Sequence, residues 1–382
     1  MAKRFKVLID SYHLYHLPQM EPVAKLLIID PNFDVYFSTS HNVDIEEREL
    51  TLKIFDKNNW KYILGEDEED RKKQIRKYDP DVFICGWSRY PIQDFCEPDT
   101  ICCMIYHGIG IKPSYYRDHN KRLDIRFIEG SFREKQLRNY GVESDLELVG
   151  FAKIDPLFNG EIGTQREVLE QLGLDPAKKT ILYAPTFYPS SFEIFGLKLT
   201  ELTKGYNLII KLHQWVYHKG NFAGMNFKKQ QKLIKKIAER YPDVKIIKPE
   251  DYNITPLYRA ADVMLTEASS TIYEIIALRK HVIICNFFKK RLSHQISEKR
   301  LFKRRLDINM KSDLYDFCYH INSPQELPEA LDKCFNKPDP FIDIRNKYID
   351  KMLYKLDGKT SKRIVEAIMK HLKNRSQDLK RN

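Results

Sequence analysis

The sequence predicts an α/β protein built from two Rossmann-like domains that face one another across a cleft. Short apolar runs of strand length recur along the chain and alternate with polar, helix-compatible segments, a rhythm that indicates repeated βα units. Most of these runs are continuously apolar, as expected of strands covered on both faces of a parallel sheet. The length of 382 residues exceeds what one hydrophobic core usually serves, which favours two domains.

Strands are predicted at the short apolar runs of strand length. In the first half these are residues 5–9, 26–29, 34–39, 60–64, 81–86, 100–106, 125–130 and 146–150. In the second half they are residues 180–187, 206–213, 243–249, 261–267 and 281–288. The polar segments 67–80, 131–142 and 227–242 are predicted as helices, because they carry helix-forming residues and end near Pro or Gly.

The predicted domain boundary lies in residues 151–178. This segment holds two Pro and three Gly, and the sheet rhythm returns directly after it. We therefore expect an N-terminal acceptor-side domain at residues 1–160 and a C-terminal nucleotide-side domain at residues 161–355. Residues 356–382 are expected to form a basic C-terminal helix or tail.

Composition limits the classes of function. The net charge of +11 indicates a polyanionic partner, which can be nucleic acid, an anionic membrane surface or a phosphorylated substrate. No apolar run approaches the roughly 20 residues of a membrane span. The N-terminal stretch is broken by Asp10, His13 and His16, so no signal peptide is expected. The seven cysteines show no metal-ligand spacing and are predicted to be buried thiols in a reducing cytosol.

Candidate site residues are sought where predicted strands end, because ligands of open parallel sheets bind beyond the carboxyl ends of the strands. His107 follows the run 100–106 directly, and an imidazole there suits a general base. Gly108 allows close approach of the backbone to a ligand, and Lys112 can reach a phosphate if the loop folds back. The alternative is a glycine turn with a structural histidine.

Two further strand ends carry polar residues. Thr186 ends the run 180–187 and leaves a hydroxyl at its tip. Lys211 and His213 alternate with apolar residues, so both are predicted to project to one side of the strand end. A cation beside a neutral donor suits a diphosphate. An ordinary loop and a structural histidine are the alternatives.

Three consecutive hydroxyl residues, Ser269, Ser270 and Thr271, follow the run 261–267. Thr271 and Glu274 have the spacing of a capping box, so Thr271 is predicted to cap the next helix. Capping needs only one hydroxyl. The other two are therefore predicted to bind phosphate at the helix N-terminus, where N–H groups are unpaired.

These motifs, in this order, resemble the CDP-glycerol glycerophosphotransferase family over about residues 80–290. The segments that carry the resemblance are HGIGIK (107–112), LVGFAKID (148–155), ILYAPTF (181–187), KLHQ (211–214) and YRAADVMLTEASSTIYEIIALRKHVI (258–283). The resemblance implies a GT-B fold and a peripheral enzyme of the cytoplasmic membrane face. It also implies transfer of glycerol phosphate from CDP-glycerol to a lipid-linked or glycan acceptor, with release of CMP.

The resemblance also implies residue roles. His107 is expected to be the base on the acceptor hydroxyl and His213 to stabilise the diphosphate. Substrate-binding roles are expected for Gly108, Lys112, Thr186, Lys211, Glu267, Ser269, Ser270 and Thr271.

The chain departs from the family pattern at four places. The His-Pro of the family is His213-Gln214 here, its Asp-Tyr-Ser-Ser begins with Glu267-Ala268, Ile109 follows His-Gly, and Lys153 replaces Arg in the linker. These departures leave the donor open between CDP-glycerol, a related CDP-polyol and a nucleotide sugar.

No cofactor or metal is expected, since no carboxylate cluster suits magnesium, although Asp262 and Glu267 lie near the predicted site. Residues 289–305 hold eight Lys or Arg and are predicted either to lie on anionic lipid or to form a solvated basic helix. The tail 362–382 is predicted either to do the same or to fray.

Three other functions are considered. They are a GT-B glycosyltransferase, a non-catalytic scaffold of polymer assembly, and a nucleic-acid-binding protein. The last is disfavoured because the basic residues are spread along the chain and no binding motif is present.

Overall fold

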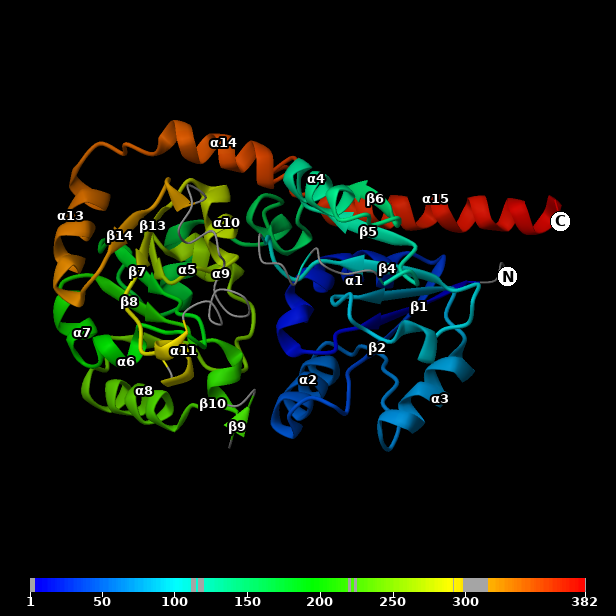
Figure 1. Cartoon of the computed structure of the whole chain (residues 1–382), viewed down its shortest axis with the longest axis horizontal. Helices are drawn as coiled ribbons and strands as arrows, with labels where there is room; N and C mark the ends of the chain where they lie inside the picture. The colour runs from blue at the N-terminus through cyan, green and yellow to red at the C-terminus, as the bar shows by residue number, and fades with distance from the viewer. Residues whose placement is uncertain are drawn as a thin grey trace. The chain divides into compact units, whose positions relative to one another are not determined.

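The computed structural model describes residues 4–110, 115, 120–218, 221–222, 225–290, 292–297 and 315–381. They form two compact units (Figure 1). Unit 1 consists mainly of Met1–Ile109, Ser114–Asn159 and Lys351–Asn382, and unit 2 mainly of Gly160–Asp350. The predicted α/β fold class is confirmed, since each unit is built on a six-stranded parallel sheet.

Unit 1 contains a sheet in the order β2-β1-β3-β4-β5-β6, with every neighbouring pair parallel. Its strands are β1 (Phe5–Asp10), β2 (Phe33–Ser38), β3 (Val82–Cys85), β4 (Ile101–Ile105), β5 (Ile125–Ile128) and β6 (Asp145–Leu148). Its helices are α1 (Leu17–Ile29), α2 (Ile45–Lys57), α3 (Glu68–Tyr78), α4 (Ser131–Asn139) and α15 (Thr360–Arg381). The strand order reverses between β1 and β3, so the loops that leave these two strands form a topological switch point.

The strand predicted at residues 26–29 is wrong, because these residues are the last turn of α1. The buried residues of α1 include Leu17, Met20, Val23, Ala24 and Leu27, which recur at helical spacing. A run of four apolar residues does not distinguish a strand from a helix end, and the preceding periodicity decides for the helix. The run 60–64 contributes only a single bridge, between Tyr62 and Phe37.

Unit 2 contains a sheet in the order β11-β8-β7-β12-β13-β14, again parallel throughout. Its strands are β7 (Thr180–Tyr183), β8 (Asn207–Ile210), β11 (Lys245–Ile246), β12 (Val263–Thr266), β13 (His281–Cys285) and β14 (Tyr319–Ile321), with a separate hairpin of β9 (Asn221–Phe222) and β10 (Met225–Asn226). Its helices are α5 (Gln165–Gln171), α6 (Phe192–Phe195), α7 (Lys198–Leu202), α8 (Lys228–Arg240), α9 (Thr255–Ala260), α10 (Thr271–Ile275), α11 (Leu292–Ile296), α13 (Leu327–Asn336) and α14 (Ile342–Met352), which ends in unit 1. Here the switch point lies between β7 and β12.

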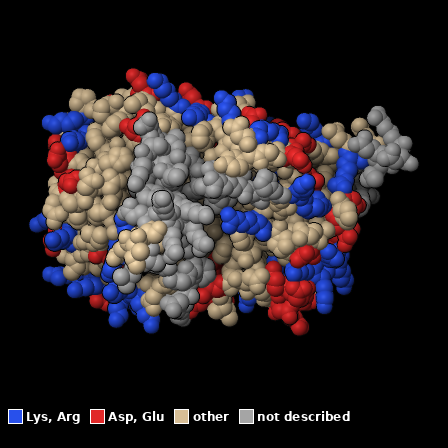
Figure 2. Space-filling model, viewed as in Figure 1, with Lys and Arg blue, Asp and Glu red and all other residues tan. Residues whose placement is uncertain are grey.

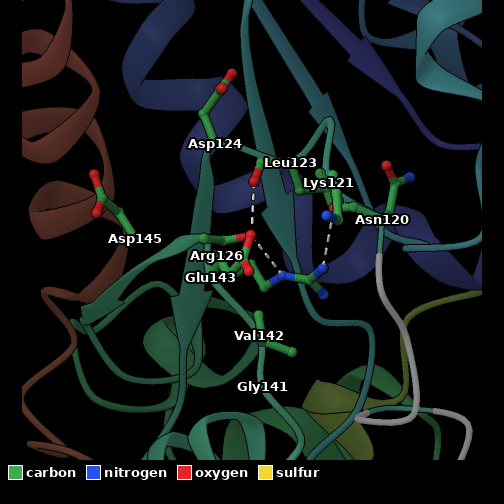
Figure 3. Close-up of a pocket in the computed structure, with 10 residues that line it drawn as sticks. Asn120, Lys121, Leu123, Asp124, Arg126, Gly141, Val142, Glu143 and Asp145 are labelled. Atoms are coloured by element: carbon green, nitrogen blue, oxygen red, sulfur yellow. Dashed lines mark hydrogen bonds between the residues drawn. The ribbon is translucent and has the colours of Figure 1, made fainter.

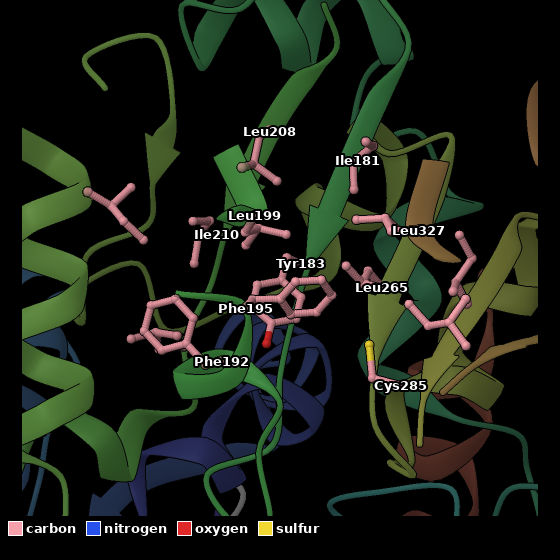
Figure 4. Close-up of a cluster of buried hydrophobic side chains, with 14 of the residues drawn as sticks. Ile181, Tyr183, Phe192, Phe195, Leu199, Leu208, Ile210, Leu265, Cys285 and Leu327 are labelled. Carbon is pink, nitrogen blue, oxygen red and sulfur yellow. The ribbon is translucent and has the colours of Figure 1, made fainter. Parts of the chain in front are cut away.

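One face of the unit 2 sheet packs against α6, α7, α8 and α13 (Figure 4). Tyr183 of β7 and Leu265 of β12 meet Phe192 and Phe195 of α6, and Leu327 brings α13 to the same cluster. Side chains that alternate along each strand supply this face, while their neighbours are buried on the other. The rigid sheet fixes the loops that leave its carboxyl edge.

The C-terminal helix α15 is part of unit 1. Its apolar residues Ile364, Ile368 and Leu372 are buried, and Asp155 binds its first turn through the backbone N–H of Thr360 (3.1 Å) and Ser361 (2.6 Å). The prediction that this segment frays or lies on lipid is therefore wrong for the apolar face of α15, because that face is packed against protein.

The seven cysteines are all buried and unpaired, which confirms the prediction of buried thiols. No helix in the described part of the chain is long and apolar enough to cross a membrane. On the face drawn in Figure 2, Lys and Arg lie among Asp and Glu rather than in one basic band. Of the predicted lipid-binding segment 289–305, residues 291 and 298–305 lie outside the described part.

Candidate active site

In unit 1, His107 follows β4 at the carboxyl edge of the sheet. Its Nδ1 lies 2.9 Å from the carbonyl oxygen of Gly86. Because a carbonyl only accepts, Nδ1 carries the proton and Nε2 keeps a lone pair in the neutral ring. The Tyr115 hydroxyl, 3.2 Å away, donates to that lone pair. The structure therefore presents His107 in the tautomer that a general base requires.

Burial lowers the pKa of His107 to about 4, although the hydrogen bond to Gly86 acts in the opposite direction. The positive charges of Lys153 and Arg133 contribute to the lowering, as does His13. The imidazole is consequently neutral at pH 7.

We expect the activity of the chain to persist at mildly acidic pH. A base works only when deprotonated, so the acid limb that His107 causes in kcat/KM should fall near its pKa of about 4 rather than near the ordinary histidine value of roughly 6.5. The measurement is kcat/KM from pH 4.5 to 8, with circular dichroism at each pH to confirm that the chain stays folded. A limb near 6.5 would show that His107 is not buried as described or is not the base.

The segment after His107 is fixed by a buried ion pair. Arg133 of α4 donates to the carbonyl of Gly108 (3.3 Å) and pairs with Glu129 at 2.8 Å. Arg133 therefore holds the backbone of Gly108 in the turn beside His107. The predicted phosphate ligand Lys112 lies outside the described residues.

The loop that follows β1 supplies residues that sequence reasoning missed. His13, Tyr15 and His16 gather at the switch point of unit 1, where the His16 ring stacks on His107 with centroids 4.5 Å apart and Tyr15 contacts it edge-on at 5.4 Å. Nδ1 of His13 lies 3.1 Å from the buried Glu47 carboxylate. The clue was the repeat HLYHL directly after an apolar strand.

In unit 2, Glu267 holds the loop 184–191 at the switch point between β7 and β12. Its carboxylate has no exposed surface and accepts from the backbone N–H of Thr186 and of Ser191, each at 2.6 Å. The Glu267 carboxylate also accepts from the Ser191 hydroxyl at 2.5 Å. That hydroxyl lies 2.8 Å from the hydroxyl of Tyr183. Both carboxylate oxygens thus accept hydrogen bonds from the loop 184–191. In this structure Glu267 holds the loop that carries Thr186, whereas the sequence predicted that it binds substrate.

Burial raises the pKa of Glu267 to about 7, against the opposing effect of its hydrogen bonds from Ser191 and Thr186. A carboxyl whose pKa rises on folding binds its proton more tightly in the folded chain. The stability that this linkage supplies is complete below the ordinary pKa of 4.5 and is lost as the pH rises through about 7.

Lys211 and His213 leave the end of β8. The Lys211 ammonium donates to the carbonyl of Asp251 at 2.6 Å. Nδ1 of His213 accepts from the backbone N–H of Trp215 at 3.2 Å, and its ring lies 4.8 Å from that of Phe187. The structure thus brings His213 against the same loop that carries Thr186.

The predicted capping box at Thr271 and Glu274 is wrong. The residue before α10 is Ser270, its side chain makes no capping bond, and α10 has only five residues. Glu274 instead accepts from the buried hydroxyl of Tyr258 at 2.8 Å. The Thr271 hydroxyl donates to Ser269 Oγ at 3.0 Å. All three hydroxyl residues are partly exposed, so Ser269 and Ser270 remain predicted phosphate ligands without a long helix behind them.

A cavity of about 410 Å³ lies elsewhere in unit 1 (Figure 3). Residues 120–124 precede β5 and residues 141–144 precede β6, so this cavity opens at the amino edge of the sheet, away from the carboxyl edge where His107 lies. Among the described residues, its lining mixes Lys121 and Arg126 with Asp124, Glu143 and Asp145 and holds no histidine or cysteine. We therefore place the candidate site at the carboxyl edges.

The family model described as CDP-Glycerol:Poly(glycerophosphate) glycerophosphotransferase matches residues 130–370. A teichoic acid poly(glycerol phosphate) polymerase of Bacillus spizizenii is 24% identical over 221 residues, which are 53% of this chain and 48% of that protein. A teichoic acid glycerol-phosphate primase of Bacillus subtilis is 25% identical over 220 residues, 56% of this chain and 50% of that protein. The chain thus spans about half the length of these curated relatives.

Solved structures show the same fold. A variant of the wall teichoic acid polymerase TagF, soaked with CDPG, superposes with a TM-score of 0.69 at 14% identity, covering 97% of this chain and 89% of that chain. The UDP-GlcNAc 2-epimerase of Neisseria meningitidis, bound to UDP-GlcNAc, gives a TM-score of 0.58 at 15% identity over 96% of this chain and 100% of that chain. These likenesses confirm the predicted GT-B fold.

Proposed function

The chain belongs to the CDP-glycerol:poly(glycerophosphate) glycerophosphotransferase family, and on that premise we propose that it transfers a polyol phosphate unit from a CDP-activated donor to an acceptor hydroxyl. Glycerol phosphate is the proposed unit, since the family description names it. The new bond joins the acceptor oxygen to the phosphorus that bears the polyol, and the bond from that phosphorus to CMP breaks. The acceptor proton goes to the base.

The observation that carries the proposal is the tautomer of His107. A partly buried, neutral imidazole whose Nδ1–H is held by the Gly86 carbonyl has one basic lone pair, at Nε2. In the resting structure the Tyr115 hydroxyl donates to that lone pair, and in the reaction the acceptor hydroxyl takes its place. Phosphoryl transfer needs positioning and charge stabilisation more than covalent help, and a base in this state supplies proton removal without further activation.

Unit 2 is proposed to hold the donor diphosphate. The loop 184–191 carries the Thr186 hydroxyl and contacts His213 through Phe187. Lys211 leaves the neighbouring strand, and Ser269, Ser270 and Thr271 leave β12. A cation, an imidazole and several hydroxyls at one sheet edge suit the charge of a diphosphate in the transition state. Binding by Ser269 and Ser270 rests here on their partly exposed hydroxyls.

The acceptor is proposed to be lipid-linked or a glycan, and the enzyme to work peripherally at the cytoplasmic face of the membrane. The names of the relatives, a polymerase and a primase, suggest a growing poly(glycerol phosphate) chain or its first unit as the acceptor. Basic segment 289–305 is the proposed contact with anionic lipid.

A panel of donors tests this function. The purified full chain is incubated with CDP-glycerol, CDP-ribitol or UDP-GlcNAc, and with a lipid-linked acceptor that either carries or lacks a first glycerol phosphate. We expect CMP release from CDP-glycerol that depends on acceptor. UDP release from UDP-GlcNAc alone would instead identify a glycosyltransferase. If neither CDP-polyol gave CMP with any acceptor, the proposed function would be rejected.

A further inference from the structure

His16 lies beneath the candidate base and is 1% exposed. Its ring stacks on the His107 ring with 4.5 Å between centroids and 30° between planes. Neither His16 nitrogen has a hydrogen-bond partner among the described residues. One of the two nitrogens must carry a proton, so a buried donor is left unpaired, which disfavours the folded state. An apolar side chain would pack in the place of His16 without an unpaired donor, so packing alone does not explain a histidine there.

Gly86 links the two rings. Its carbonyl oxygen accepts from Nδ1 of His107, and a Cβ at Gly86 would lie 2.9 Å from Cε of Met20 and 3.1 Å from Cγ of His16. The absence of a side chain therefore lets the His16 ring press against the backbone that orients His107. His16 follows β1 and Gly86 follows β3, so both lie at the switch point of unit 1, where ligands of such sheets bind.

We propose that His16 is a positioning residue for the transfer reaction, acting through His107. The flat ring of His16 covers one face of the His107 imidazole, holds its plane in line with the Gly86 carbonyl and keeps water away from that face. The inference rests on the proposed function, because it assumes that His107 Nε2 takes the acceptor proton.

Of the aromatic rings that contact His107, Tyr15 and Tyr115 meet it at steeper angles than His16, whose ring is stacked on it. Tyr15 contacts the ring edge-on, and Tyr115 reaches Nε2. His13, Lys153 and Arg133 act on it by charge. Burial is the largest cause of the low pKa of His107, and His16 supplies the stacked part of that burial. Removing the ring should therefore raise the pKa of His107 and loosen its orientation together.

Two variants separate stacking from simple stability. His16→Phe keeps a flat ring, and His16→Ala removes it. For His16→Ala we expect kcat to fall by about 10- to 100-fold with little change in KM for the donor, because misplacing the base affects the chemical step. The acid limb of kcat/KM should move from near 4 towards the ordinary histidine value of about 6.5. His16→Phe should keep kcat within roughly 3-fold of the wild type, with the limb unmoved.

A loss of stability alone would lower the amount of folded enzyme without moving the limb, so an unmoved limb and unchanged kcat in folded His16→Ala would overturn the proposal. It would equally be overturned if His16→Phe lost as much kcat as His16→Ala. Should His16→Ala fail to fold, His16→Leu takes its place, since it fills the space without a flat ring. Wild-type kcat in that variant would again contradict stacking as the cause.

Titration of the His107 ring by nitrogen-15 NMR, without substrate, tests the same contact independently of turnover. A raised pKa of His107 in His16→Ala supports the positioning role even if the donor panel yields no CMP. An unchanged pKa opposes it even if transfer is observed. Failure of the proposed function and failure of this inference are thereby distinguished.

Discussion

Replacing His107 by asparagine is expected to lower kcat by about 10²- to 10⁴-fold, the range that a positioned general base contributes. The asparagine amide can still donate to the Gly86 carbonyl, so the turn after β4 should keep its shape. It has no basic lone pair to take the acceptor proton. The measurement is the initial rate of CMP release at saturating donor and acceptor, with KM for the donor determined alongside.

The matched control is His371→Asn in the same unit. His371 lies on α15 and its Nε2 is 3.1 Å from Glu147, a partly exposed contact of small energetic weight. Its kcat should stay within about 2-fold of the wild type. If His107→Asn retained more than roughly a tenth of the wild-type kcat, His107 would be excluded as the base.

Replacing Glu267 by glutamine is expected to destabilise unit 2 by about 2–4 kcal/mol, because a buried acceptor of several donors becomes partly a donor itself. One glutamine oxygen can still accept, but the amide NH₂ must then face the N–H of either Thr186 or Ser191. The loop 184–191 should shift, and kcat should fall by about 10- to 100-fold. Urea denaturation measures the free energy of unfolding, and the rate of CMP release at saturating substrates measures kcat.

Glu274→Gln is the comparison for this change. Glu274 is also buried in the segment after β12, but the Tyr258 hydroxyl that donates to it can donate equally to an amide oxygen. We expect a smaller loss of stability there. The fall in stability of the wild type as the pH rises through about 7 should be reduced in Glu267→Gln, since Glu267 is the carboxyl with the raised pKa. If Glu267→Gln and Glu274→Gln lost the same free energy of unfolding, the proposed role of Glu267 in holding the loop 184–191 would be contradicted.

The sheets were predictable from sequence because continuous apolar runs have a physical cause, burial on both faces. Where the pattern was ambiguous, as at residues 26–29, helical periodicity upstream was needed to decide. The strand β14 at Tyr319–Ile321 was missed because His320 interrupts its short apolar run. Polar residues at strand ends pointed to His107, Thr186 and His213, since the topology of a parallel sheet places such ends on one edge.

The contacts that define the site were not predictable in the same way. His16 meets His107 across 91 positions of sequence, and Glu267 meets Thr186 across 81. Such pairs depend on the order of the strands in each sheet. No local sequence pattern specifies that strand order. The capping box failed for a related reason, because Glu274 found a partner in Tyr258, on α9. The spacing of Thr271 and Glu274 predicted a hydrogen bond within the helix start, whereas in the folded chain Glu274 accepts from the distant Tyr258.

The position of α15 has a consequence for how the chain is made. Asp155 belongs to unit 1, yet the helix that binds it and buries Ile364 and Ile368 is synthesised about 200 residues later, after the whole sheet of unit 2. Domains commonly fold in the order of synthesis, but unit 1 must wait for α15, by which time unit 2 already has its whole sheet. A nascent chain released early, before residue 360, would carry a finished unit 2 and an exposed apolar face on unit 1. Such a truncated product would be a natural client of chaperones and proteases.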